Sequence, residues 1–240
     1  MGGMDWWVSS VYQNGGISML LAWIFWVIGS IVLHELAHGW VAIRSGDNTP
    51  RESGHMTWNP LVHMGFHSLL FFAVLGIAWG AMPVNPDRFR DRYDPAKVAA
   101  AGPAMNLGLA LVCAVGFCVW LPLATKMWFP SLDVPEHVGR NVLVFFELGL
   151  MLNLVLMMFN LLPVPPLDGS RIVGNFSWRY ERFWQGEHAQ WIALAALVGL
   201  FFFGGKFLFP VARDLSDEIT GAISRGLFRV FPPHAPSVTP

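Results

Sequence analysis

Residues 17–43 read ISMLLAWIFWVIGSIVLHELAHGWVAI, an apolar run that is long enough to cross a membrane as a helix. His34, Glu35 and His38 stand near its end, where ionisable side chains are costly and are usually retained for function. Positions i and i+4 share one helix face, so both imidazoles can bind one cation while Glu35 reaches a metal-bound water. The stretch predicts a metal site inside a membrane helix. The alternative is a helix end that emerges into water with two solvated histidines.

The composition and the remaining apolar runs indicate a membrane protein. Hydrophobic residues make up 54% of the 240 residues and charged residues 13%, which is unlike a water-soluble domain. The formal net charge of -1 argues against a nucleic-acid partner. Three further runs are long enough to span, at 98–121, 142–162 and 190–209, and another at 66–81 is short. We therefore expect an all-α polytopic membrane protein with about four transmembrane helices.

A third metal ligand is needed, because a catalytic zinc site usually has three protein ligands and one open position. Asp168 is the strongest candidate. It follows the third long run in LLPVPPLDG, residues 161–169, where prolines end a helix. Irregular backbone at membrane depth is tolerated where it lines a protein cavity such as a metal pocket. The alternative is that Asp168 is a turn residue or the N-cap of a helix that starts near Ser170.

Three ordered motifs resemble a known family. They are VLHELAHG at 32–39, AGPAMN at 101–106 and FNLLPVPPLDG at 159–169. Together they resemble the site-2 protease family of intramembrane zinc metalloproteases. The segments GHMTWNPLVH at 54–63 and PVNP at 83–86 are similar to its compact branch, although Gly65 stands where that branch has an acidic residue. We expect neither a PDZ domain nor a nucleotide-sensing domain within these residues.

The resemblance implies a role for each of the motif residues. Glu35 is the implied catalytic residue, which activates a zinc-bound water, and no cofactor besides zinc is expected. Asn106 and Asn160 are implied to contact substrate or the oxyanion. The alternative for Asn106 is a hydrogen bond between two helices. The alternative for Asn160 is a hydrogen bond that supports the metal ligands without contacting substrate. One zinc ion is expected, with three protein ligands, His34, His38 and Asp168.

The directions of the helices decide whether the short run 66–81 crosses. If the first span runs from side A to side B, Asp168 must reach the depth of the histidines, so 142–162 also runs from A to B. The run 98–121 then returns to side A, and 66–81 begins and ends on side B. We therefore expect a re-entrant segment over about residues 54–86.

The basic residues are divided unequally between the two sides. Side A holds Lys126 and Arg140. Side B holds nine basic residues before the last run: Arg44, Arg51, Arg88, Arg90, Arg92, Lys97, Arg171, Arg179 and Arg182. By the positive-inside rule, side B is cytoplasmic, and the active site is predicted to lie toward the cytoplasmic face.

The segment before the re-entrant run predicts a short β-like hairpin near the metal site. GHMTW at 54–58 has strand-forming residues and precedes the breaker Asn59-Pro60. We hypothesise that this stretch, or the re-entrant segment, pairs with an extended substrate by strand addition. His55, His63 and His67 could modulate the site or bind metal transiently, and the alternative is that they simply line a wet loop.

We expect three parts along the chain. Residues 1–210 form a single membrane-embedded metalloprotease domain. Apolar residues at helical spacing, with charges on the other faces, predict an amphipathic interfacial helix at 211–231. The proline-rich end, 232–240, is expected to be disordered.

The function that these observations favour is hydrolysis of peptide bonds within or near a membrane span. The chain would be a zinc metalloendopeptidase in the plasma membrane of a prokaryote, and its partners would be the lipid bilayer and a membrane-protein substrate with a transmembrane segment. The alternative is a metal ion or proton transporter, because ion paths also place carboxylates and imidazoles inside spans. Against a transporter, no second cluster of such residues marks an exit on side A.

Overall fold

The computed structural model describes residues 6–232, and this part of the chain is helical without strands. Four helices are long: α1 (Trp7–Arg44), α4 (Asp94–Ala124), α5 (Glu136–Asn160) and α9 (Gly205–Val230). The shorter elements are α2 (Thr49–Glu52), α3 (Pro60–Leu75), the 3-10 helix η1 (Pro86–Arg88), α6 (Asp168–Phe176), α7 (Trp178–Trp184) and α8 (Ala189–Phe203). The all-α prediction is confirmed.

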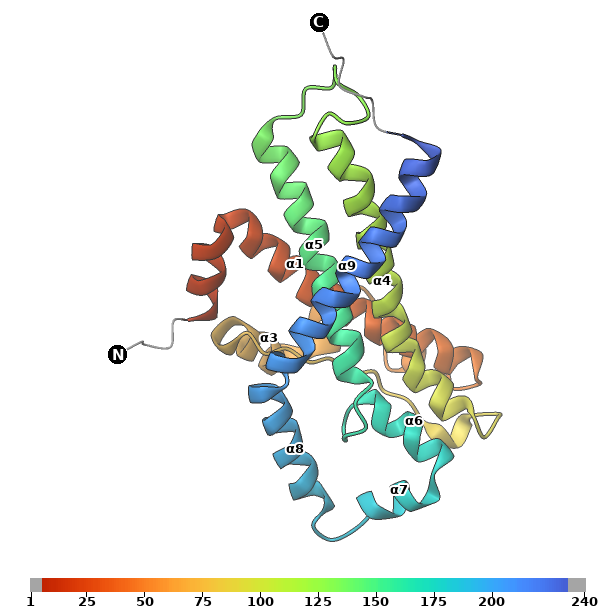
Figure 1. Ribbon diagram of the computed structural model, residues 1–240. Coiled ribbons are helices and arrows are strands. Elements are labelled where there is room, and N and C mark those ends of the chain that lie inside the picture. The colour runs from red at the N-terminus through yellow and green to blue at the C-terminus, as the bar shows by residue number, and fades with distance from the viewer. Residues whose placement is uncertain (1–5, 233–240) are drawn as a thin grey trace, which may run out of the picture.

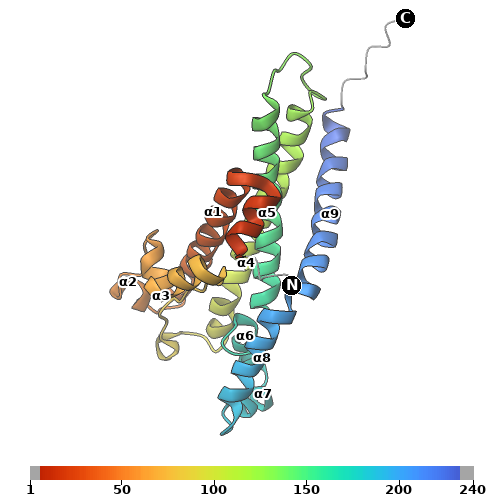
Figure 2. The ribbon, with the colours of Figure 1, turned by 90° about the vertical axis from the view of Figure 1, so that its left-hand side faces the viewer.

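The centre of the molecule is a bundle in which α4 packs against α5 and α1 (Figure 1). Small buried side chains on α4, at Ala110, Cys113 and Ala114, allow the neighbouring helices to approach closely. Trp26 of α1 packs against them, and its indole donates a hydrogen bond to the carbonyl oxygen of Phe145 at 2.8 Å. Figure 2 shows α6, α7 and α8 gathered at one end of the bundle, while the connection between α4 and α5 lies at the other end.

Three helices are long and apolar enough to cross a membrane, namely α1, α4 and α5. The fourth predicted span, 190–209, is not one straight helix. It is divided between α8 and α9, which meet at 58°. Gly204 and Gly205 lie at the break, where glycine weakens a continuous helix. The structure therefore has three candidate spans, or four if the bent pair counts as one.

The short run predicted not to cross forms α3 and an extended return. As one straight helix the 16 residues of α3 would reach about 24 Å, and α3 is also kinked at Gly65, so it is shorter than the roughly 30 Å of a hydrocarbon core. After α3 the chain doubles back along this helix, as shown by the hydrogen bond of 2.9 Å from the amide of Ala81 to the carbonyl oxygen of His63. The predicted out-and-back path is thus present in the structure. Its depth in a bilayer stays a prediction.

The predicted β-like hairpin at 54–58 is wrong. The backbone there makes local hydrogen bonds. The amide of His55 donates to the carbonyl oxygen of Pro50, and the amide of Thr57 donates to the carbonyl oxygen of His55. These bonds close turns after α2, so the segment has no partner strand despite its strand-forming residues. Residues 77–85, after α3, lie in neither a helix nor a strand, and Asn85 at their end has extended torsion angles.

Helix α9 covers the region for which we predicted an interfacial helix. Its apolar stripe packs against the central bundle through Leu215, Ile219 and Ile223. Figure 2 shows α9 running along the bundle beside α5. The stripe therefore contacts protein, while the position of α9 relative to a bilayer stays a prediction. The predicted disordered tail, 232–240, lies outside the described residues except for its first one.

Candidate metal centre

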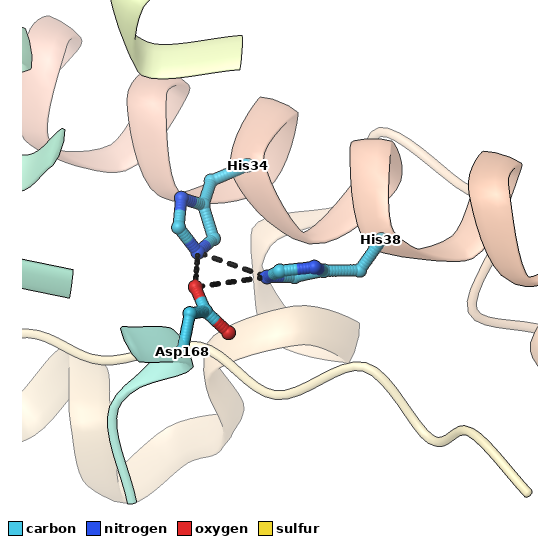
Figure 3. Close-up of side chains that lie close together, drawn as sticks. All are labelled: His34, His38 and Asp168. Atoms are coloured by element: carbon cyan, nitrogen blue, oxygen red, sulfur yellow. Dashed lines mark hydrogen bonds and ion pairs between the residues drawn. The ribbon is translucent and has the colours of Figure 1, made fainter. Parts of the chain in front are cut away.

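Two helices bring three potential metal ligands together (Figure 3). His34 and His38 project from successive turns of α1 toward Asp168, the first residue of α6. The helix α5 ends at Asn160, and the prolines that follow prevent it from continuing, so the chain turns before α6 begins. The three ligand side chains are buried, with 7% of His34, 7% of His38 and 8% of Asp168 exposed.

The three ligand atoms lie at nearly equal distances from one another. The Nε2 atoms of His34 and His38 are 3.0 Å apart. The Oδ2 atom of Asp168 lies 3.1 Å from the first and 3.3 Å from the second. Ligands about 2.0 Å from a tetrahedral zinc ion stand about 3.3 Å from each other, so the spacing fits zinc. Within residues 6–232, no other group of three or more histidine, cysteine, aspartate or glutamate side chains is arranged so that it could bind a metal ion.

Both imidazoles turn their other nitrogen toward α4. His38 Nδ1 donates to the carbonyl oxygen of Val98 at 2.6 Å, and His34 Nδ1 donates to the side-chain oxygen of Asn106 at 2.6 Å. With the proton on Nδ1, each Nε2 carries a lone pair. Two lone pairs and a carboxylate oxygen that lacks a hydrogen-bond donor then face one point, an arrangement that a bound cation stabilises.

Room for an ion exists because residue 102 on α4 is glycine. A Cβ atom added to Gly102 would lie 2.5 Å from the Nε2 atom of His38 and closer still to that of His34. The donor set of two imidazoles and one carboxylate is also one that catalytic zinc sites use. The residues present therefore fit zinc.

Glu35 lies beside the three ligands and is itself 7% exposed. It is near enough to His34, His38 and Asp168 to interact with their charges. The extended return after α3 passes directly over it, since a Cβ added to Gly80 would lie 2.7 Å from both the Cγ and the Oε1 atoms of Glu35. Glycine at position 80 thus permits close approach of a backbone segment to the carboxylate.

Buried polar side chains fix the return segment at two points, Trp79 and Asn85. The hydroxyl of Ser68 on α3 donates to the carbonyl oxygen of Trp79 at 2.7 Å and accepts from its amide at 2.9 Å. Further along, the carboxylate of Asp47 accepts from the amides of Asn85 and Thr49 at 2.7 and 2.9 Å. Burial raises the pKa of Asp47, but hydrogen bonds from the Thr49 hydroxyl and from these two amides together outweigh it and lower the pKa overall. Asp47 is thus an ionised anchor, which sequence reasoning missed.

The two predicted asparagines differ in their surroundings. Asn106 is fully buried and bonded to His34, so the geometry favours its supporting role. Asn160 is partly buried, and its amide nitrogen donates to Leu156 of its own helix at 3.0 Å. Sequence reasoning missed Asn153, a fully buried asparagine on α5 that accepts a hydrogen bond from Asn106 at 3.0 Å. A polar residue inside the apolar run 142–162 was the available signal.

The three other predicted histidines lie on or before α3 and outside the metal-binding group. His63 is buried, and its Nε2 donates to the carbonyl oxygen of Thr57 at 2.7 Å. His55 stands near it, with ring centroids 6.3 Å apart, and His67 lies beside Phe66. These three histidines therefore make contacts within residues 55–67.

Comparison with known proteins decides the family. A sequence model described as "Peptidase family M50" matches residues 131–203. YwhC of Bacillus subtilis (strain 168), which is described as a "Putative zinc metalloprotease", is 36% identical over 159 residues, or 65% of this chain and 69% of that protein. The chain belongs to peptidase family M50. This is the site-2 protease family that the motifs resemble.

Other M50 relatives carry the same description. MJ0611 of Methanocaldococcus jannaschii is 29% identical over 162 residues, or 68% of this chain and 74% of that protein. Rip2 of Mycobacterium tuberculosis is 31% identical over 151 residues, or 60% of this chain and 52% of that protein. No solved structure matches the chain significantly. With its long apolar helices, this M50 chain is an integral membrane metalloprotease that uses zinc.

Proposed function

We propose that this chain is an intramembrane zinc endopeptidase that hydrolyses peptide bonds within or near the transmembrane segments of other membrane proteins. The observation that supports it most strongly is the buried group of His34, His38 and Asp168 beside Glu35, on a helix long enough to span a membrane. A hydrolytic site of this kind inside a bundle can act on a peptide bond that lies at membrane depth. The substrate is a membrane protein with a transmembrane segment.

Zinc, when bound, polarises the scissile carbonyl and makes water acidic enough to lose a proton near neutral pH. His34, His38 and Asp168 would hold the ion, and the bonds from the imidazoles to Val98 and Asn106 orient both rings. Glu35 accepts the proton from the attacking water and then delivers it to the nitrogen of the leaving amine. Burial of the carboxylate keeps competing solvent away from this proton transfer.

The extended return offers a backbone edge for the substrate beside Glu35. Along extended backbone, successive N–H and C=O groups point to opposite sides. Trp79 and Ala81 use one side to bond α3. The N–H and C=O groups of Gly80 then point to the other side, away from α3, while the position of its absent side chain faces Glu35. We therefore move the proposed strand addition from 54–58 to residues 78–82, where an extended substrate would lie next to the carboxylate.

Cysteine cross-linking distinguishes this strand pairing from binding of a helical substrate. Ala81 is exposed, so Ala81→Cys should form disulfides with a substrate in which single cysteines are placed along the cleavage region. We expect cross-links at alternate substrate positions, because an extended strand repeats every two residues. The matched control is Ala73→Cys on the exposed side of α3, which should give none. Cross-links at a spacing of three or four residues would contradict strand addition.

We further propose that the metal centre faces the cytoplasm in a prokaryotic plasma membrane. The centre lies near the end of the bundle where α4 begins and α6 follows α5. Basic residues are concentrated in the segments at this end, including Arg88, Arg90, Arg92, Arg171, Arg179 and Arg182. The positive-inside rule supports a cytoplasmic position for such residues. The relatives named above come from bacteria and an archaeon.

Reconstitution tests the proposal against the transporter alternative. The full chain is placed in sealed vesicles with single-span model substrates tagged at both ends, and the products are identified by mass spectrometry. We expect cuts inside or close to the span, loss of cleavage with a zinc chelator and recovery when zinc is added back. Uncleaved substrates together with zinc flux across the vesicle membrane would identify a transporter instead.

A further inference from the structure

A chain of buried amides connects the metal ligand His34 on α1, through α4, to a backbone carbonyl of α5. Asn106 Oδ1 lies 2.6 Å from His34 Nδ1, and the amide nitrogen of Asn106 donates to Asn153 Oδ1 at 3.0 Å. The amide nitrogen of Asn153 in turn donates to the backbone carbonyl oxygen of Gly149 at 2.9 Å. Both asparagines are fully buried, so water does not substitute for any of these partners.

The two ligand histidines differ in how their protons are fixed. His38 Nδ1 faces the carbonyl oxygen of Val98, which can only accept, so this nitrogen must carry the proton. His34 Nδ1 faces an asparagine, and a carboxamide can present either an acceptor oxygen or a donor NH2 group. Asn106 by itself therefore leaves the tautomer of His34 undetermined.

The last hydrogen bond of this series, from Asn153 to Gly149, removes this ambiguity. The carbonyl of Gly149 can only accept, so Asn153 must turn its NH2 group toward it and its oxygen toward Asn106. Asn106 must then donate to that oxygen and turn its own oxygen toward His34. The proton of His34 is consequently held on Nδ1, which leaves the lone pair of Nε2 for the metal ion.

The structure assigns to Asn153 the role of a positioning residue that sets the tautomer of His34 through Asn106. This inference rests on the proposed zinc site but not on the substrate or the reaction. If Asn106 turned over, its NH2 group would face His34 and its oxygen would face the oxygen of Asn153. Each buried polar group left without a partner costs about 1 to 3 kcal/mol, which the chain of bonds avoids.

Two substitutions at position 153 separate this role from simple packing. Asn153→Leu keeps a similar volume but presents no acceptor to Asn106, so the Asn106 amide is free to turn over. Asn153→Asp keeps an acceptor oxygen toward Asn106, and when protonated its hydroxyl still donates to Gly149, so the direction of the chain is retained. The control is Thr220→Val, which removes a similar bond from a side chain to a backbone carbonyl within one helix, α9.

Two measurements on the purified full chain test the assignment. Nitrogen-15 chemical shifts of labelled histidine in the zinc-free protein report the tautomer, with the His34 signals identified by their loss in His34→Gln. We expect the Nδ1–H form in the wild type, Asn153→Asp and Thr220→Val, and a mixture of tautomers in Asn153→Leu. Zinc affinity, measured by competition with a chelator, should fall about 10-fold to 100-fold in Asn153→Leu, as when other supporting partners of metal ligands are lost.

A second variant covers the case in which Asn153→Leu does not fold, as judged by its thermal unfolding. Asn106→Leu removes the acceptor of His34 directly and should lower the zinc affinity to a similar extent. A pure Nδ1–H signal in Asn153→Leu, or equal losses of zinc affinity in Asn153→Leu and Thr220→Val, would overturn the inference. Neither measurement depends on cleavage, so failure of the proposed protease activity would be seen separately.

Discussion

Glu35→Gln should abolish cleavage while the protein keeps its zinc. The substitution preserves the shape of the side chain but removes the group that accepts and returns the proton. Loss of general acid and base catalysis lowers rates by about 10²-fold to 10⁴-fold. Glu35 is not one of the three metal-binding residues, so zinc content should stay near that of the wild type. The measurement is the cleavage rate in reconstituted vesicles, with zinc determined in the same sample.

The matched control for this change is Glu147→Gln. Glu147 is also an acidic residue within a candidate span, but it is exposed on α5. The Glu147→Gln variant should retain wild-type cleavage. That result would show that the loss in Glu35→Gln is specific to Glu35 and does not follow from removal of a carboxylate anywhere in a membrane helix. Undiminished cleavage by Glu35→Gln would refute the assignment of Glu35 as the base.

Gly102→Ala should eliminate zinc binding even though it adds only one methyl group. The new Cβ atom would lie 2.5 Å from His38 Nε2 and closer to His34 Nε2, in the space that an ion needs. Helix α4 holds its backbone on that side, and both rings are tied to the same helix, so neither partner can yield easily. We expect zinc affinity to fall by more than the roughly 100-fold that loss of a supporting residue costs.

Gly108→Ala is the matched control, because an added Cβ at that position of the same helix meets no atom within 4 Å. Both substitutions raise helix propensity by about 1 kcal/mol, so a general effect on α4 would appear in both. Chelator competition should therefore show wild-type zinc affinity for Gly108→Ala alone. Equal affinities in the two variants would mean that the ion does not sit against Gly102.

Much of the metal centre could be predicted because local spacing and helix direction constrain it strongly. The spacing of His34 and His38 places both on one helix face, as the structure shows. The need for Asp168 to reach the same depth fixed the relative directions of the spans. It also predicts that 66–81 does not cross the membrane. The structure shows the chain returning along α3, and its depth in a bilayer stays a prediction.

Other features depend on tertiary contacts that no local pattern reveals. The residues at 54–58 favour a strand by type, but they close turns after α2. The apolar stripe of α9 predicts an apolar partner, and the pattern alone does not distinguish lipid from the bundle against which Leu215 and Ile219 pack. Asn153 is one polar residue in an apolar run, and its partner Asn106 lies 47 positions away.

Zinc-edge X-ray absorption of the purified full chain tests most directly whether His34, His38 and Asp168 hold one zinc ion. We predict one zinc per chain, coordinated only by nitrogen and oxygen at about 2.0 to 2.2 Å, with outer-shell scattering from two imidazoles. Zinc bound through sulfur at about 2.3 Å, or a chain that retains no zinc when the ion is supplied, would contradict the account.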